Sequence, residues 1–308
     1  MNPYDYHHDA PQASLQLRKD SVRWLSYTVT FPTACPTPLA EGNMVRGEYY
    51  QPKQGSIAPL AILVHGMGDS SLIPCQLLAR ALVKQGIACF ILYLVFHSSR
   101  MSAAVKGRFP ELTGDEWFQG YQLSVIDIRQ VVDWAYQRAE LNREQIAILG
   151  ISFGGLVSAI AMGIDRRIKA GVLITAGGNS EKMIWLSKAN RYRTRYQCTE
   201  AEYQQIQSSY ARYLAQVSQK GFQQVTPPRR GFLADPMTFA SYLRHRPLLM
   251  INALWDKYIP REAVLDFWQA CGQPPLRWFP AGHSSLWLWY PAIRRQISGF
   301  LRSVLDMG

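Results

Sequence analysis

A serine flanked by glycines at residues 150–155, Gly-Ile-Ser-Phe-Gly-Gly, carries the strongest chemical signal in the sequence. The segment follows a predicted buried strand and opens a predicted helix, which is the context of a G-x-S-x-G nucleophile elbow. Glycines allow the close backbone approach that such a turn requires, and a helix N-terminus favours developing negative charge. The alternative is a glycine-rich turn in which Ser152 only caps the helix, and this motif alone does not decide between the two.

A nucleophilic serine requires a general base that removes its proton and an acid that orients the base. His283 is the candidate base, because it lies between the last predicted strand and the last predicted helix, although a structural role near the helix start is also open. Asp256 is the candidate acid, because it follows the fifth buried run by a few residues. Asp235 precedes a proline and fits a turn or a helix cap better. The candidates therefore occur in the order Ser152, Asp256, His283.

Two loops that follow buried runs are candidates for the remaining parts of such a site. Residues 65–68, His-Gly-Met-Gly, come after the first run, and acyl transfer needs N–H donors preorganised for an oxyanion. The backbone N–H groups of Met67 and of Phe153, the residue after the serine, are the expected donors. The alternative is an ordinary strand-to-helix loop with a structural His65. Residues 97–100, His-Ser-Ser-Arg, either line a substrate pocket or form a loop with satisfied polar groups.

The elements that would position these residues alternate regularly along the chain. Short apolar runs, bounded by loops, are separated by segments with helical periodicity, which predicts parallel strands buried on both faces. We therefore expect an α/β fold with a doubly wound, mostly parallel sheet. Residues 22–31 and 44–51 alternate more loosely and predict an antiparallel lead-in at one edge. The apolar runs are residues 60–64, 88–95, 146–149, 170–175, 247–253 and 276–279, and the helical segments are 74–85, 121–138, 152–162 and 285–305.

The alternation is interrupted by a segment that predicts a helical cap insertion at residues 179–235, with helices near 181–190 and 199–220. The core then comprises residues 21–178 and 236–308, and residues 1–20 are expected to be a flexible tail. The positive charge of the insertion favours either an anionic or phosphate-bearing substrate, an anionic membrane surface, or simply a solvated basic face. Its candidate residues for a pocket roof are Trp185, Tyr192, Tyr196, Tyr203, Tyr210 and Tyr213.

Composition narrows the class of protein. The 308 residues are 48% hydrophobic and 18% charged, which fits one large folded domain and argues against global disorder. The net charge is +11, but no compact Lys/Arg run suggests a nucleic-acid partner. The five cysteines are dispersed without a CxxC pair, and no apolar stretch is long enough for a transmembrane helix or a signal peptide. A cytoplasmic location and the absence of a metal site are the resulting expectations.

Four motifs in this order, HGMG, GISFGG, LWDKYIP and AGHSS, resemble the α/β-hydrolase superfamily in its serine-esterase and dienelactone-hydrolase-like branches. The resemblance covers roughly residues 44–178 and 236–308. It implies a hydrolase of a carboxylic ester or a related acyl bond, which acts on a small molecule without a metal or an organic cofactor. It is much less specific for the substrate than for the fold.

The resemblance implies a catalytic triad of Ser152, Asp256 and His283, with the oxyanion held by the backbone N–H groups of Met67 and Phe153. Two alternatives differ in function but share the fold. One is a catalytically silent relative that acts as a binding protein, and the other is a thioesterase or peptidase that uses the same triad. Neither the natural substrate nor the oligomeric state follows from the sequence.

Overall fold

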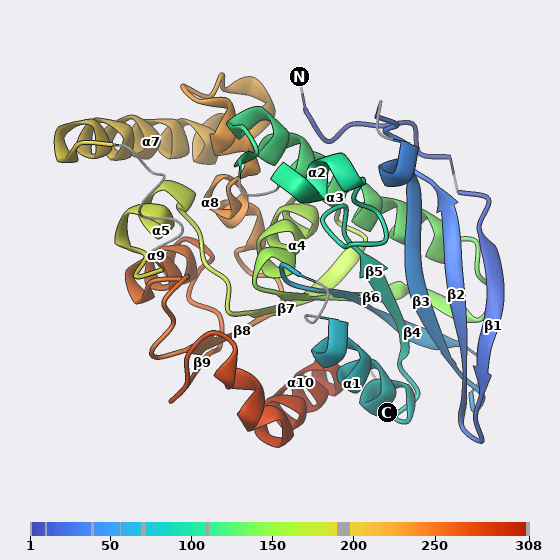
Figure 1. Cartoon of the computed structure of the whole chain (residues 1–308). Helices are drawn as coiled ribbons and strands as arrows, with labels where there is room; N and C mark the ends of the chain where they lie inside the picture. Colours follow the sequence, from blue (N-terminus) through green and yellow to red (C-terminus); the bar gives the residue numbers. More distant parts are fainter. Residues whose placement is uncertain are drawn as a thin grey trace.

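One mixed sheet carries the described part of the chain, with six parallel strands and an antiparallel extension at one edge (Figure 1). The structure, a computed structural model, describes residues 2–9, 11–37, 40–55, 57–68, 72–108, 111–189 and 198–305. Within these residues, the strands lie in the spatial order β1 (Ser14–Asp20), β2 (Trp24–Pro32), β3 (Met44–Pro52), β5 (Ala88–Tyr93), β4 (Ala58–Val64), β6 (Leu141–Ile151), β7 (Ile168–Ile174), β8 (Leu248–Ala253) and β9 (Leu276–Phe279).

Helices cover both faces of the sheet, as the alternation of the sequence predicts (Figure 1). The principal helices are α1 (Leu72–Val83), α2 (Ala103–Arg108), α3 (Gly114–Ala135), α4 (Phe153–Ile164), α5 (Ser180–Leu186), α7 (Glu200–Lys220), α8 (Pro236–Phe239), α9 (Arg261–Ala270) and α10 (Tyr290–Val304). Short 3₁₀ helices are η1 (Ala40–Asn43), η4 (Phe222–Gln224), η5 (Arg230–Ala234), η6 (Ala240–Leu243) and η7 (Ser285–Trp289).

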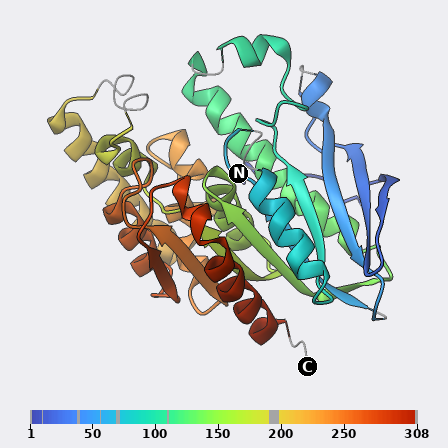
Figure 2. The same cartoon turned by 60° about the horizontal axis from the view of Figure 1, so that its bottom comes forward.

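Alternate side chains of the central strand β4 pack in two separate hydrophobic cores, one on each face of the sheet. Leu60 and Ile62 of β4 pack with α3 and α4 on one face, whereas Ala61 and Leu63 pack with α1 and α10 on the other. All four side chains are fully buried. A strand buried on both faces must be apolar at every position, which is why its sequence is a continuous run. Figure 2 shows α1 and α10 side by side on their face of the sheet.

The antiparallel edge confirms one prediction and corrects another. β2 and β3 pair antiparallel along their whole length, as the looser alternation predicts. The predicted flexible tail at residues 1–20 is wrong, because Ser14–Asp20 forms β1 and pairs antiparallel with β2. Nearly every residue of this strand is exposed. Its signal in the sequence is the short alternation of Leu15 and Leu17 with polar residues.

The first residues of the chain are also held in place. Tyr4 is fully buried, and its hydroxyl donates a hydrogen bond to the Leu233 carbonyl at 2.6 Å. The Arg129 guanidinium donates in turn to the Tyr4 carbonyl at 2.6 Å. Burial raises the pKa of the Tyr4 hydroxyl well above its ordinary value, because the phenolate is excluded from water. A single buried tyrosine thus anchors a segment whose sequence is otherwise polar.

The insertion leaves the core after β7 and returns before β8. Its predicted helices correspond to α5 and α7, although residues 190–197, and with them Tyr192 and Tyr196, lie outside the described residues. The buried Asp235 carboxylate closes the insertion, because it accepts hydrogen bonds from the backbone N–H groups of Asn179 (2.9 Å) and Ser180 (2.5 Å). It also caps α8, as the sequence predicts. Burial raises the pKa of Asp235, although these N–H donors oppose the shift.

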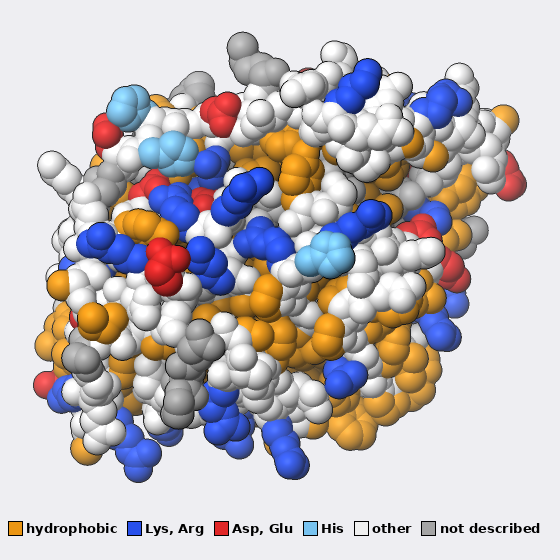
Figure 3. Space-filling view, turned by 180° about the vertical axis from the view of Figure 1, so that it is seen from behind, with side chains coloured by type: hydrophobic (Ala, Val, Ile, Leu, Met, Phe, Trp, Pro, Cys, Tyr) orange, Lys and Arg blue, Asp and Glu red, His pale blue; other side chains and the backbone are white. Residues whose placement is uncertain are grey.

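Most aromatic side chains in the described part of the insertion are buried. Tyr203 stacks on Trp185 with ring centroids 4.7 Å apart, and Tyr210 stacks on Phe232 at 4.1 Å. Tyr213 packs beside Tyr210. The positive net charge of the chain is visible on the face drawn in Figure 3, where Lys and Arg side chains outnumber Asp and Glu. Among the described residues, no helix combines the length and apolarity needed to cross a membrane.

Candidate active site

The candidate nucleophile lies on a strained turn between β6 and α4. β6 ends at Ile151 and α4 begins at Phe153, so Ser152 is the only residue between strand and helix. Its backbone angles are φ 54° and ψ −119°, a conformation that residues with a side chain seldom adopt. The Ser152 N–H donates to the Ile174 carbonyl of β7 at 2.8 Å, which anchors the turn to the neighbouring strand.

The glycines around the serine are required for space. A Cβ on Gly150 would lie 2.4 Å from the Gly154 carbonyl oxygen, and one on Gly154 would lie 2.3 Å from the Val64 carbonyl oxygen. A Cβ on Gly155 would lie 2.7 Å from the Ala176 side chain. None of the three glycines has a positive φ, so the conformational freedom of glycine is not what this turn uses. The turn instead lets α4 start in direct backbone contact with β4 and β6.

Three side chains that are distant in sequence form a continuous hydrogen-bonded chain. The Nε2 atom of His283 lies 2.9 Å from Oγ of Ser152, and its Nδ1 atom lies 2.7 Å from Oδ2 of Asp256. A carboxylate can only accept, so Nδ1 carries the proton and Nε2 is left to accept from the serine hydroxyl. The structure thus brings together the three residues that the sequence suggests, in the geometry of a nucleophile, its base and an orienting acid.

Asp256 is held by hydrogen bonds that leave one oxygen for the histidine. Its Oδ1 atom accepts from the backbone N–H groups of Tyr258 (2.8 Å) and Ile259 (3.0 Å). The Asp256 side chain is 3% exposed, whereas that of His283 is 19% exposed. The imidazole is therefore open to a substrate while the carboxylate is shielded from water.

The loops that carry the acid and the base are bonded to each other. Asp256 follows β8 and His283 follows β9, and these strands are parallel neighbours. The Leu254 N–H donates to the Phe279 carbonyl, and the Trp255 N–H donates to the Ala281 carbonyl, each at 2.9 Å. These bonds continue the sheet ladder beyond the strand ends. The separation of acid and base is consequently fixed by the backbone as well as by the side chains.

The two candidate oxyanion donors come from the residue after the serine and from the loop after β4. Phe153 is the first residue of α4, so its N–H belongs to the turn whose N–H groups have no partner within the helix. Met67 follows β4, and the close packing of Gly154 on the carbonyls of Val64 and His65 places this loop beside the start of α4. A loop that packs this closely on the first turn of the helix is suitably placed for a second N–H donor.

His65 is a structural residue of this loop. Its Nε2 atom accepts from the Leu94 N–H at 3.0 Å, and its Nδ1 atom lies 2.6 Å from the Gly66 carbonyl oxygen. The first bond requires an unprotonated Nε2, so Nδ1 is the donor and the imidazole is neutral. The side chain is 1% exposed. The alternative that gives His65 a structural role thus agrees with its contacts, and the histidine links the Met67 loop to the end of β5.

The 97–100 loop is held by its own interactions. The Ser99 N–H donates to Nδ1 of His97 at 3.2 Å. Arg100 is almost fully buried and pairs with Asp127, with Nη1 and Oδ2 2.8 Å apart. Its second terminal nitrogen donates to the Gly42 carbonyl at 2.8 Å. These contacts favour the second of the two alternatives for this segment, a structural loop, although the buried Nε of Arg100 has no hydrogen-bond partner among the described residues.

One residue near the site was not singled out from the sequence. The Tyr258 ring packs edge-on against the His283 imidazole, with centroids 5.0 Å apart and an interplanar angle of 62°. It follows Asp256 by two residues, and that proximity in the LWDKYIP motif is the signal that points to it. Within the described residues, no group of three or more His, Cys, Asp and Glu side chains is arranged to hold a metal ion.

Comparison with known proteins gives a consistent result for the fold. The family model of the alpha/beta hydrolase fold matches residues 59–199. An acetyl xylan esterase from a Paenibacillus species superposes with a TM-score of 0.68 at 20% sequence identity, over 94% of this chain and 89% of that chain. Acetyl xylan esterase 1 from a Thermoanaerobacterium species gives a TM-score of 0.62 at 13% identity, over 97% and 91% of the two chains.

A further similar structure is a cold-adapted esterase from an Arctic intertidal metagenomic library, with a TM-score of 0.58 at 16% identity over 91% of this chain and 96% of that chain. No curated protein sequence matches this chain. Identities this low support the fold and not a particular substrate. The family match, the structural similarities and the topology of the sheet together identify the chain as a protein with the α/β-hydrolase fold.

Proposed function

We propose that the protein hydrolyses a carboxylic ester through an acyl-enzyme formed on Ser152. The observation that carries this proposal is the hydrogen-bonded chain from Ser152 through His283 to Asp256. A buried carboxylate, a more exposed imidazole and a serine on a strained turn are the groups that nucleophilic acyl transfer needs. The esterases of similar fold support an ester as the bond that is cleaved.

The first half of the reaction forms the acyl-enzyme. Oγ of Ser152 attacks the carbonyl carbon while its proton passes to Nε2 of His283. Asp256 stabilises the imidazolium that results, and the backbone N–H groups of Met67 and Phe153 stabilise the oxyanion. Collapse of the tetrahedral intermediate breaks the bond to the alkoxy oxygen, which leaves as the alcohol with the proton from Nε2.

The second half releases the acid. Water attacks the acyl carbon and gives its proton to Nε2 of His283, which again acts as base. The second tetrahedral intermediate breaks the bond to Oγ, and the proton returns from His283 to Ser152. The enzyme is regenerated, and no redox step or external co-reactant besides water is needed.

We propose a short acyl group as the substrate class, because two of the similar structures are acetyl xylan esterases.

The insertion at residues 179–235 serves as the cap over this site. Its support is direct contact with the loop of the acid, because the hydroxyl of Ser187 and the N–H of Lys188 both donate to the Lys257 carbonyl, at 2.9 and 3.0 Å. Trp185 lies in α5, which leads directly to this contact, so a Trp185→Ala variant should change KM across esters of graded chain length.

Hydrolysis of p-nitrophenyl acetate tests the proposed nucleophile. Ser152→Ala should reduce turnover to the background rate while the far-ultraviolet circular dichroism stays unchanged. Ser303→Ala is the matched control, because Ser303 is an exposed serine near the end of α10 and should keep full activity. Turnover by the Ser152→Ala variant at the parent rate would overturn the proposal.

A fluorophosphonate probe separates an enzyme from a silent relative with the same fold. The probe should label the parent chain once, at Ser152, and should leave the Ser152→Ala variant unlabelled. A folded parent chain that is not labelled would show that the serine is unreactive and would favour a binding protein. Thioesters and peptides, tested beside the esters, then determine which acyl bond is preferred.

A further inference from the structure

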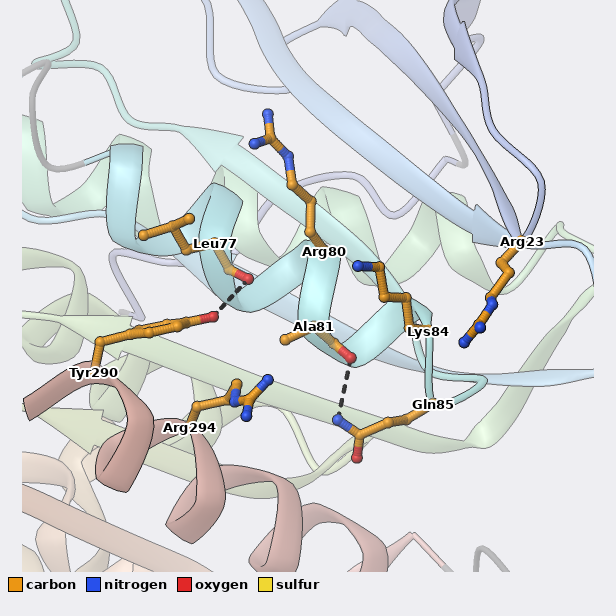
Figure 4. Close-up of a pocket in the computed structure, with 8 residues that line it drawn as sticks. All are labelled: Arg23, Leu77, Arg80, Ala81, Lys84, Gln85, Tyr290 and Arg294. Carbon is orange, nitrogen blue, oxygen red and sulfur yellow. Dashed lines mark hydrogen bonds between the residues drawn. The ribbon is translucent and has the colours of Figure 1, made fainter.

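A pocket outside the candidate active site lies between α1 and α10 and is lined by basic side chains (Figure 4). Its volume is about 490 Å³, which is in the range of sites that hold small molecules. Arg80 and Lys84 come from α1 and the residue after its end, Arg294 comes from α10, and Arg23 comes from the connection between β1 and β2. No acidic residue is among the described residues that line it.

The four cations lack acidic partners in the part of the chain that the structure describes. None of Arg23, Arg80, Lys84 and Arg294 forms an ion pair there, and all four side chains are exposed. Like charges that share one pocket repel each other, and no acidic side chain among the described lining residues relieves this repulsion. An arrangement of this kind favours the binding of an anion that bridges the cations.

Helix electrostatics accounts for only part of the arrangement. Arg80 lies in the last turn of α1 and Lys84 directly follows it, where a cation is favoured by the helix dipole. Arg294 has no such reason, because it lies in the second turn of α10, near the positive end of that helix. Arg23 lies in a strand connection, outside any helix. Two of the four cations therefore need another explanation.

The walls of the pocket are fixed relative to each other. The Tyr290 hydroxyl donates to the Leu77 carbonyl at 2.9 Å, and Nε2 of Gln85 donates to Oγ of Ser298 at 3.1 Å. The first bond joins α1 to α10 and is drawn in Figure 4, and the second joins the segment that follows α1 to α10. Cations on two tied helices are preorganised, so little ordering is required of the backbone when an anion binds.

We propose that this basic pocket binds a small molecule with a diphosphate or triphosphate group. The guanidinium groups of Arg23 and Arg294 can bind phosphate oxygens through bidentate hydrogen bonds, and Lys84 adds a point charge. The Arg80 side chain points away from Lys84 and Arg294 and hydrogen-bonds the Tyr50 side chain, so it adds charge only at the edge of the pocket (Figure 4). An anion with several charges can contact cations on three elements at once, whereas a single carboxylate cannot. The proposal does not depend on the ester hydrolysis proposed above, because no residue of that site lines the pocket.

Isothermal titration calorimetry with inorganic pyrophosphate tests the site in about 150 mM salt, where interactions over more than about 8 Å are largely screened. The parent chain should bind one equivalent, and Arg294→Ala should weaken binding about tenfold or more. Arg295→Ala is the matched control, since it removes the same charge from the next, exposed residue of α10, which does not line the pocket. It should change the affinity less than about twofold. Lys84→Met should weaken binding in the same direction as Arg294→Ala.

Several results would overturn the proposal. One is that the parent chain gives no heat of binding at millimolar pyrophosphate. A second is that the Arg294→Ala and Arg295→Ala substitutions weaken the affinity for pyrophosphate equally. A third is that the parent chain binds acetate as tightly as pyrophosphate. Vesicles of phosphatidylcholine with and without phosphatidylglycerol provide the comparison with a membrane. Sedimentation with the anionic vesicles, combined with no binding of pyrophosphate, would show that a lipid surface and not a soluble phosphate is the partner.

Discussion

The N–H of Trp255 donates to the carbonyl of Ala281 at 2.9 Å, so the loop that contains Asp256 is bonded directly to the loop that contains His283. The two loops follow adjacent parallel strands, and the bond extends their pairing past the last ladder residues. The hydrogen bond between Asp256 and His283 is therefore supported by backbone hydrogen bonds between the two loops that carry them. Its geometry is set by the backbone pairing of β8 and β9 and of the loops that follow them.

This relationship predicts the effect of removing the charge of the acid while keeping its shape. Asp256→Asn should lower kcat for p-nitrophenyl acetate by about 10³–10⁴-fold, because an amide can hold the wrong tautomer of His283 and cannot stabilise the imidazolium. KM should change little, since Asp256 does not face the substrate. Steady-state kinetics checks this, and a fall in KM together with an unchanged kcat would contradict the proposed role.

A second prediction concerns space at the serine turn. Gly154→Ala should lower the free energy of unfolding by about 2–3 kcal/mol and abolish esterase activity, because the new Cβ would collide with the Val64 and His65 carbonyls. Gly299→Ala is the matched control, since a Cβ at that exposed position of α10 meets no atom within 4 Å. It should raise stability by up to about 1 kcal/mol. Urea unfolding of both variants distinguishes a steric collision of the new Cβ from the general effect of replacing a glycine by alanine.

The sequence predicts some parts of the fold much better than others, and the difference has a physical cause. The run at 60–64 is apolar because β4 is buried on both faces, so its composition alone identifies it. Nearly every residue of β1 is exposed, and the short alternation of Leu15 and Leu17 with polar residues is all that distinguishes it from a polar tail. Helix α9 is not predicted, although its buried residues Ala263, Val264 and Phe267 are at helical spacing.

The site shows the same contrast. Ser152, Asp256 and His283 can be predicted because each follows a recognisable strand within a few residues, and the ends of parallel strands meet at one edge of the sheet. The Met67 loop was found for the same reason. The contact of Tyr258 with His283, and the bonds of Ser187 and Lys188 to the Lys257 loop, depend on how an insertion and a loop pack in three dimensions. No periodicity in the sequence encodes such packing.

A third prediction concerns the ion pairs of Arg167 with two buried carboxylates. Arg167 bonds to Asp165 and Asp133, with N–O distances of 2.7 and 2.6 Å, and both carboxylates are 4% exposed. Burial disfavours the charged form of Asp165, but the hydrogen bonds and charge of Arg167 more than offset this, so the pKa of Asp165 is lowered. Arg167→Met should therefore reduce the free energy of unfolding at pH 7 by about 1–3 kcal/mol.

The pH dependence of this loss of stability follows from the lowered pKa of Asp165. A lowered folded pKa stabilises the folded state above the unfolded value of about 3.9, and this contribution is lost as pH falls through the folded pKa. The difference between parent and Arg167→Met should thus be constant near neutrality and should shrink below about pH 4. Arg166→Met, an exposed neighbour, is the control and should follow the parent. If the difference in the free energy of unfolding between the parent and Arg167→Met increased as the pH falls, the proposed stabilisation of the Asp165 carboxylate by Arg167 would be wrong.

The last prediction concerns the first residues of the chain. Tyr4→Ala should lower the free energy of unfolding by about 3–5 kcal/mol, because it empties a fully buried site packed against Phe239. Tyr4→Phe removes only the hydroxyl, which leaves the Leu233 carbonyl without this donor and should cost about 1 kcal/mol. His7→Ala is the control, because the His7 side chain is 88% exposed and should contribute almost nothing. Guanidinium unfolding of the three variants gives the comparison. If the segment were a flexible tail, Tyr4→Ala and His7→Ala would be equally stable, so the ranking of these two variants decides whether Tyr4 anchors the chain.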